Sequence, residues 1–263
     1  MQRMRQNTTL ASVVLIGLAI AFGGCGGGSQ APLTAPAPVS QNATVSGQYS
    51  LVLTSTNGRG TIHIYTNITQ TGKTFAGATD TLVCPSNDLS QCQGQGASSG
   101  AVSGANVTII ISFPSAGQAD TVTMVGTAGI SLAGTYTDSL GDAGTWTASP
   151  TSSLSGTYNG TFNSTSNALS IAPAILISLA QDASFHLTGA ATITNSPCIT
   201  SLNLAGLAIG GAFSLTDATS KANIIALPTD SGFIFSYTFE PSAPSCAGDF
   251  GRGTLTGHNP WGY

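Results

Sequence analysis

Runs in which every second residue is apolar recur along this chain, between short clusters of turn-forming residues. The clearest run, residues 233–239, carries an aromatic side chain at each alternate position. A period of two places one set of side chains on a buried face of a β-strand and the other on a solvated face. Pairs such as Asn57-Gly58, Thr71-Gly72 and Asn159-Gly160 are typical of the hairpin turns between such strands. The chain is therefore predicted to be all-β.

The composition agrees with this prediction and excludes several classes of protein. Only 6% of the 263 residues are charged, 41% are hydrophobic, and the six Lys and Arg residues cannot form the basic surface that a nucleic-acid-binding protein needs. This apolar content with a low net charge also argues against disorder. Long helices are not expected, because Thr, Val, Ile and Gly are frequent and strong helix formers are scarce. Residues 168–180 are the one stretch that could form a helix, and Pro173 weakens it.

Four landmarks occur twice in the same order and indicate an internal duplication. An opening Gly-x-Tyr holds Gly47 and Tyr49 in the first copy, and a closing Gly-Asp-x-Gly turn holds Asp142. The second copy repeats these positions as Gly156, Tyr158 and Asp249. Between them, residues 75–78 match 187–190, and residues 134–137 match 235–238. These repeated positions are expected to be structural, since Asp in a Gly-flanked turn usually binds its own backbone.

The repeats define the expected domains: residues 47–149 for the first copy and 154–257 for the second, joined by a short polar linker. About eight strands are predicted in each copy, and about 100 residues are enough for a separate core. Short turns between consecutive strands favour meanders that close and so remove exposed edges. We therefore predict two tandem antiparallel barrels, similar to lipocalins or avidin in architecture only. One fused β-sandwich is the alternative.

The N-terminus has the features of an export signal. Arg3 and Arg5 precede an apolar run over residues 10–22, which is too short to span a bilayer by itself. The sequence Phe22-Gly23-Gly24-Cys25 follows. It resembles the lipobox of bacterial lipoproteins, with Phe in place of the usual Leu.

This resemblance implies that residues 1–24 are a signal peptide and that Cys25 carries a diacylglycerol and an amide-linked acyl chain such as palmitate. Several acyl chains are enough for stable attachment to a membrane. Gly26, in place of the Asp that retains lipoproteins in the inner membrane, is similar to outer-membrane members of the family. The Gly- and Pro-rich residues 25–46 are expected to be a flexible tether, and residues 258–263 a short tail.

The four remaining cysteines allow three disulfide pairings. The repeat favours Cys84–Cys92 and Cys198–Cys246, one bond in each copy. No closely spaced pair suitable for zinc or an iron–sulfur cluster is present, so neither a metal nor another cofactor is expected. His63 and His186 are predicted to be exposed strand residues that do not form a site together.

The sequence contains two partial matches to catalytic motifs, and both are poor. Residues 96–100 fit the G-x-S-x-G pattern around Ser98, but they are predicted to lie in a loop with no helix to follow. Gly72-Lys73-Thr74 resembles the end of a P-loop that lacks its first glycine, and it is interpreted as a hairpin turn. We therefore predict that the chain is not an enzyme.

The expected function is that of an exported, membrane-anchored lipoprotein of the bacterial cell envelope, with a structural or adhesive role. A cell-envelope protein or a glycan could be its partner. The alternative is a binding protein that holds a small apolar ligand inside a barrel, since eight strands leave room for one small molecule. A porin is disfavoured because the aromatic residues show no repeating position at the strand ends.

Overall fold

A computed structural model of the chain describes residues 42–85, 93–115, 118–129, 131–165, 172–240, 242–243 and 247–257. The predicted signal peptide, Cys25, Cys92, Cys246, the C-terminal tail and all but the last five residues of the predicted tether lie outside these residues. Within the described residues, no helix is long and apolar enough to cross a membrane.

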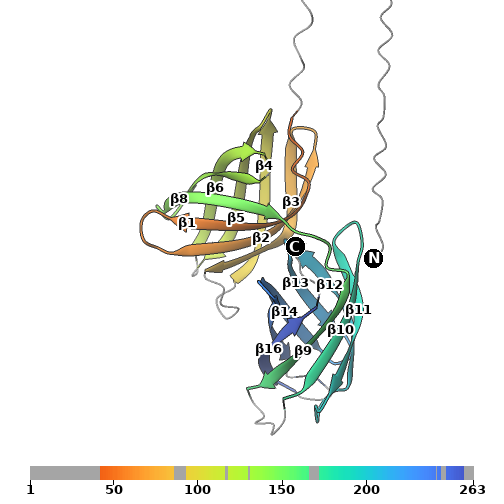
Figure 1. Cartoon of the computed structure of the whole chain (residues 1–263). Helices are drawn as coiled ribbons and strands as arrows, with labels where there is room; N and C mark the ends of the chain where they lie inside the picture. Colours follow the sequence, from red (N-terminus) through yellow and green to blue (C-terminus); the bar gives the residue numbers. More distant parts are fainter. Residues whose placement is uncertain are drawn as a thin grey trace, which may run out of the picture. The chain divides into compact units, whose positions relative to one another are not determined.

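The described residues form two closed barrels of eight antiparallel strands each (Figure 1). The first barrel consists of β1 (Gly47–Ser55), β2 (Thr61–Thr71), β3 (Thr74–Pro85), β4 (Gln93–Ser103), β5 (Asn106–Ser115), β6 (Gln118–Ala128), β7 (Leu132–Asp138) and β8 (Ala143–Pro150). The second consists of β9 (Gly156–Ser164), β10 (Ala174–Gln181), β11 (His186–Thr194), β12 (Ser201–Ile209), β13 (Ala212–Asp217), β14 (Ala222–Thr229), β15 (Gly232–Phe239) and β16 (Phe250–Thr256). The all-β fold, the tandem barrels and the internal repeat are confirmed, and the alternative of one fused sandwich is wrong.

Each barrel closes when its first strand pairs with its last, β1 with β8 and β9 with β16. Alternate side chains point inward and form one apolar core in each barrel. The first core contains Leu51, Leu53 and Trp146, and the second contains Tyr158 and Phe233. The period of two in the sequence thus corresponds to inward and outward faces.

The two barrels place a large side chain at an equivalent position of their interiors, but this side chain comes from a different strand in each barrel. Gly134 in β7 pairs with Trp146 in β8, whereas Phe235 in β15 pairs with Gly253 in β16. The large side chain therefore comes from the last strand in one barrel and from the preceding strand in the other. Because interiors are close-packed, a large residue on one strand requires a small one beside it.

The Asn159-Gly160 pair corrects one sequence prediction, because it lies inside β9 and is not a turn. A Cβ atom on Gly160 would collide with the backbone carbonyl of Thr254 in β16. The glycine is therefore required by the close approach of the two strands. Residues 174–180, from the stretch that could have been helical, belong to strand β10.

Ser98 corrects a second prediction, since residues 96–100 belong to strand β4 instead of a loop. Ser98 is buried, and its hydroxyl lies 3.3 Å from that of Thr66. The strained strand-to-helix turn that exposes a nucleophilic serine is therefore not formed here. Gly72 and Lys73 do form the predicted hairpin turn, between β2 and β3.

The barrels also contact each other through the outer face of β1 and β2. The Asn67 side-chain amide donates to the carbonyl oxygen of Ala208 at 2.6 Å and accepts from the amide of Gly210 at 3.0 Å. Gln181 donates to Gln48 at 2.9 Å, and Gln48 lies beside Asn67. A small apolar cluster adjoins these bonds and contains Tyr65, Cys84, Ile209, Ala212 and Leu227.

Candidate functional site

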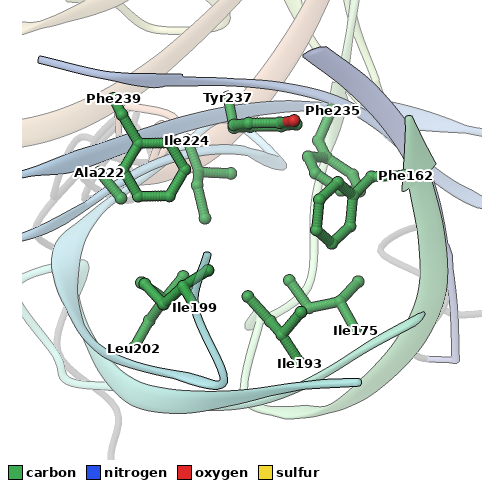
Figure 2. A pocket seen from close by; sticks show the side chains of 10 residues that line it. All are labelled: Phe162, Ile175, Ile193, Ile199, Leu202, Ala222, Ile224, Phe235, Tyr237 and Phe239. Atoms are coloured by element: carbon green, nitrogen blue, oxygen red, sulfur yellow. The ribbon is translucent and has the colours of Figure 1, made fainter. Parts of the chain in front are cut away.

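The second barrel has an apolar pocket at the end where β9, β11 and β15 finish (Figure 2). Its lining residues come from six strands and one loop. Figure 2 shows their side chains pointing inward around a hollow. The space amounts to about 310 Å³, including the part that opens to solvent. The lining residues are Phe162, Ile175, Ile193, Ile199, Leu202, Ala222, Ile224, Phe235, Tyr237 and Phe239.

Aromatic rings form one wall of this pocket. The ring of Phe162 is 5.1 Å from that of Tyr237 and 6.3 Å from that of Phe235, both edge to face. Tyr237 and Phe239 continue the row at 5.9 Å. Such edge-to-face contacts hold rings in defined orientations. The pocket therefore has a rigid aromatic side, opposite a more adaptable aliphatic side.

Among the described residues that line the pocket, only Tyr237 has a polar side-chain atom, and its hydroxyl is held by a hydrogen bond. It donates to Asp249 Oδ2 at 3.2 Å, and Ser164 Oγ donates to Asp249 Oδ1 at 2.7 Å. Burial raises the pKa of Tyr237, and the negative charge of Asp249 raises it further. The hydroxyl therefore stays protonated as a donor to Asp249.

The first barrel repeats this arrangement at the same place. Tyr136 donates to Asp142 Oδ2 at 2.8 Å, and Ser55 donates to Asp142 Oδ1 at 2.7 Å. Burial raises the pKa of Tyr136 to about 12, with the hydrogen bond and charge of Asp142 adding to the effect. Burial alone would raise the pKa of Asp142, but hydrogen bonds from Ser55, Tyr136 and Ala143 and the charge of Arg59 outweigh it and lower the pKa.

Asp142 and Asp249 thus join three elements in each barrel: the end of the first strand, the seventh strand and the closing turn. Both carboxylates are buried and accept hydrogen bonds from groups of their own barrel. They lie in different barrels, so they do not face each other as the acid and base of a hydrolase would.

The two repeats differ in polarity at the end of the barrel where the pocket opens. Tyr136 and Tyr237 are equivalent, so the residues two positions later, Asp138 and Phe239, are equivalent too. Asp138 accepts backbone hydrogen bonds from Leu140 and Asp142. Phe239 instead lines the pocket. The two barrels therefore differ in polarity at this end, which is apolar in the second barrel.

The opposite end of each barrel is closed by a pair of hydrogen bonds that the sequence analysis did not predict. In the first barrel, the Val45 amide donates to Gln70 Oε1 at 2.7 Å, and the Gln70 amide donates to Ser46 Oγ at 2.9 Å.

In the second barrel the same bonds join Leu154, Ser155 and Gln181 at 2.7 and 2.9 Å. Val45 and Leu154 are both fully buried. The repeated sequence therefore begins two residues before Gly47 and Gly156, as a hydrophobic residue followed by Ser-Gly-x-Tyr, which an alignment of the copies could have found. Tyr49 and Tyr158 then point into the barrel cores from β1 and β9.

The histidines are not brought together with other metal ligands. His186 is exposed and lies 3.4 Å from Asp182. His63 was expected to be exposed but is partly buried, because a turn of the second barrel lies across it. In the described part of the chain, no three His, Cys, Asp or Glu side chains are grouped so that they could hold a metal ion.

The structure does not test the predicted disulfides. Cys84 is buried near the end of β3, and Cys198 lies in the loop between β11 and β12. Cys92 and Cys246 lie outside the described residues. The pairings Cys84–Cys92 and Cys198–Cys246 therefore stay predictions.

No protein-family model matches the chain, and no curated protein matches it.

Proposed function

We propose that this chain is an exported, lipid-anchored binding protein without catalytic activity, whose second barrel takes up a small apolar group. The observation that carries this proposal is the pocket at the open end of that barrel. Its lining is apolar apart from the hydroxyl of Tyr237, which is held by Asp249. Ligand pockets are typically concave and apolar, with few polar groups.

The size of the pocket limits the ligand. The 310 Å³ includes open solvent at the mouth, and the cavity volume that compares with known ligand pockets is only about 20 Å³, far below the roughly 300 Å³ of pockets that hold drug-sized molecules. The ligand is therefore limited to a single ring or a branched alkyl end, and the lining side chains must shift to admit it. A larger molecule would insert only such an end group and leave its remainder outside the mouth.

The first barrel is proposed to be a structural support. Its interior is filled by large side chains such as Trp146, and the end equivalent to the pocket carries Asp138 in place of Phe239. A structural or adhesive role for the whole chain remains the second candidate, favoured by the uncharged, Thr-rich outer faces of β6, β7 and β8.

Attachment to the bacterial outer membrane through Cys25 is proposed from the sequence. The test is to express the full chain in a bacterium with radioactive palmitate. We expect label in the wild type and none in Cys25→Ser. Equal labelling of both would refute lipidation at Cys25.

Ligand binding is tested with toluene as a small apolar probe, by methyl NMR of isoleucine-labelled protein. Four isoleucines line the pocket, and Ile64, Ile109 and Ile111 lie in the other core. We expect concentration-dependent shifts at the pocket methyls and none at the three reference methyls. Shifts that are absent or spread over both barrels would contradict the proposal.

Two tryptophan variants make a matched pair. Ile199→Trp places an indole at the pocket mouth, where Ile199 is partly buried. Leu176→Trp places the same group on the outer face of β10, where Leu176 is 48% exposed. Toluene binding should be lost in the first variant and kept in the second. If neither variant binds less toluene, the probe sits elsewhere.

A further inference from the structure

A second hollow lies between the two barrels, at the opposite end of β14 and β15 from the apolar pocket. Ser50 and Val52 line it from β1, and His63 and Tyr65 from β2. The register pairs Ser50 with Tyr65 and Val52 with His63, so the four side chains form a block on the outer face of the first barrel. Residues 228–230, at the turn between β14 and β15, form the opposite wall. We call this hollow the inter-barrel groove.

The groove is spacious and polar. It measures about 630 Å³, including the part open to solvent. Beside it, Asn67 and Gln48 on the same face are hydrogen-bonded to the second barrel. The contact between the barrels is therefore closed along one part of β1 and β2 and open along the next.

The polar groups of the groove lack partners within the protein. In the described residues, no hydrogen bond engages the hydroxyls of Ser50 and Tyr65, the imidazole of His63 or the carboxylate of Asp230. Ser50 is 5% exposed and Tyr65 2% exposed. Burial raises the pKa of Tyr65 to about 12 without any hydrogen bond contributing. The hydroxyl oxygens of Ser50 and Tyr65 are not among the fully enclosed unpartnered atoms, so they face the open space of the groove and are available to a ligand.

The charge of the groove restricts what could satisfy these groups. The hydroxyls of Ser50, Tyr65 and Thr229 are neutral, and each both donates and accepts. Partial burial lowers the pKa of His63, which keeps its imidazole neutral at pH 7. Among the described residues that line the groove, only Asp230 has an acidic or basic side chain other than His63, and its carboxylate disfavours an anion.

The apolar residues of the groove add a second requirement. Val52 and Pro228 lie among the polar groups, one on each wall. They could pack against a C–H face, while the surrounding groups exchange hydrogen bonds with hydroxyls. A pyranose ring combines these two kinds of surface.

From this combination we infer that the inter-barrel groove binds a neutral saccharide residue. Ser50, His63, Tyr65 and Thr229 exchange hydrogen bonds with its hydroxyls, and Asp230 accepts from two adjacent ones. This site is independent of the apolar pocket.

The test is saturation-transfer NMR of the full chain with a mixture of methyl α-mannoside, methyl β-glucoside and methyl β-galactoside. Methyl β-glucuronide serves as the anionic comparison. At least one neutral glycoside should receive saturation and the glucuronide clearly less. If no neutral glycoside binds, or the glucuronide binds best, the inference is wrong.

Tyr65→Phe and His63→Ala locate the binding. Each should weaken it at least fivefold, whereas His186→Ala, at the exposed histidine of β11, should leave it unchanged. Tyr65→Phe also separates binding from folding, since it removes an unpartnered hydroxyl and should not lower the midpoint of urea unfolding. Equal binding by Tyr65→Phe and wild type would place the saccharide elsewhere and overturn the assignment.

The toluene experiment keeps the two proposals distinct, because none of these variants touches the apolar pocket. The source of the saccharide is resolved by repeating the measurement with the preferred residue at the non-reducing end of a trisaccharide. Equal affinity assigns the groove to the end of a glycan, and weaker affinity assigns it to a free sugar. Failure of both forms to bind overturns the inference.

Discussion

At the scale of single residues, the buried Asp142 and Asp249 are the groups on which each barrel's closing turn depends. Each binds a serine of the first strand and a tyrosine of the seventh. We expect Asp142→Asn and Asp249→Asn each to lower the free energy of unfolding by about 2–3 kcal/mol, because an amide NH₂ would face a donor hydroxyl. Urea denaturation measures this change. Asp230→Asn, an exposed control, should change it by less than about 0.5 kcal/mol.

The ionisation of Asp142 leads to a prediction for how the stability of the fold depends on pH. The pKa of Asp142 is lowered from its ordinary value of 3.8 in the folded chain, so its ionised form stabilises the fold. That contribution is complete above pH 3.8 and is lost as the pH falls through the lowered pKa. The stability difference between wild type and Asp142→Asn should therefore be constant from neutral pH to about pH 5 and shrink below 3.8. A difference that grows on acidification would contradict this account.

At the scale of elements, the turn between β12 and β13 joins the second barrel to the first. Gly210 has a φ of 56°, and a Cβ there would collide with the backbone of Tyr49 and Thr66. Gly72, in the turn between β2 and β3, has a φ of 64° and open space around it. Gly72→Ala should therefore cost only about 1–2 kcal/mol of conformational strain, and Gly210→Ala clearly more. Equal losses in urea denaturation would show that the turn is not tightly docked.

The lengths of the chain segments that the two predicted disulfides would close lead to a prediction for how much each bond stabilises the fold. In the chain-entropy model, a Cys198–Cys246 bond contributes about 4 kcal/mol and a Cys84–Cys92 bond about 2.5 kcal/mol. Cys246→Ser should therefore destabilise the chain more than Cys92→Ser. Mass spectrometry of unreduced proteolytic fragments checks the pairing directly. A fragment that links Cys84 to Cys198 or Cys246 would refute one bond per barrel.

Much of the fold could be predicted because the strands follow from sequence patterns within short segments of the chain. The alternation of residues 233–239 depends only on one strand and its two faces, and the duplicated Asp142 and Asp249 are visible in one sequence. Asn159-Gly160 was mistaken for a turn because its glycine is required by a distant strand, β16. A small apolar ligand inside a barrel was predicted only as an alternative and without the residues that line the pocket, and the inter-barrel groove was not predicted. Both depend on which side chains meet across strands, as where Phe239 replaces the carboxylate of Asp138.

At the scale of the whole molecule, the two barrels have separate cores but share a junction. One core lies in each barrel, and the small cluster around Tyr65 lies between them. The hydrogen bonds of Asn67 to Ala208 and Gly210 join the same surfaces. Each barrel should therefore stay folded when the linker is cut, while the junction holds the halves together.

A protease site introduced at residues 152–153 tests this expectation. After cleavage, circular dichroism should be unchanged and the halves should elute together in gel filtration. Adding Asn67→Ala removes buried hydrogen bonds from the junction at a cost of about 2–3 kcal/mol, which weakens association about 30- to 150-fold. The halves should then separate while both stay folded. If cleavage alone unfolds them, the barrels depend on each other for stability, and the junction is part of one cooperative unit.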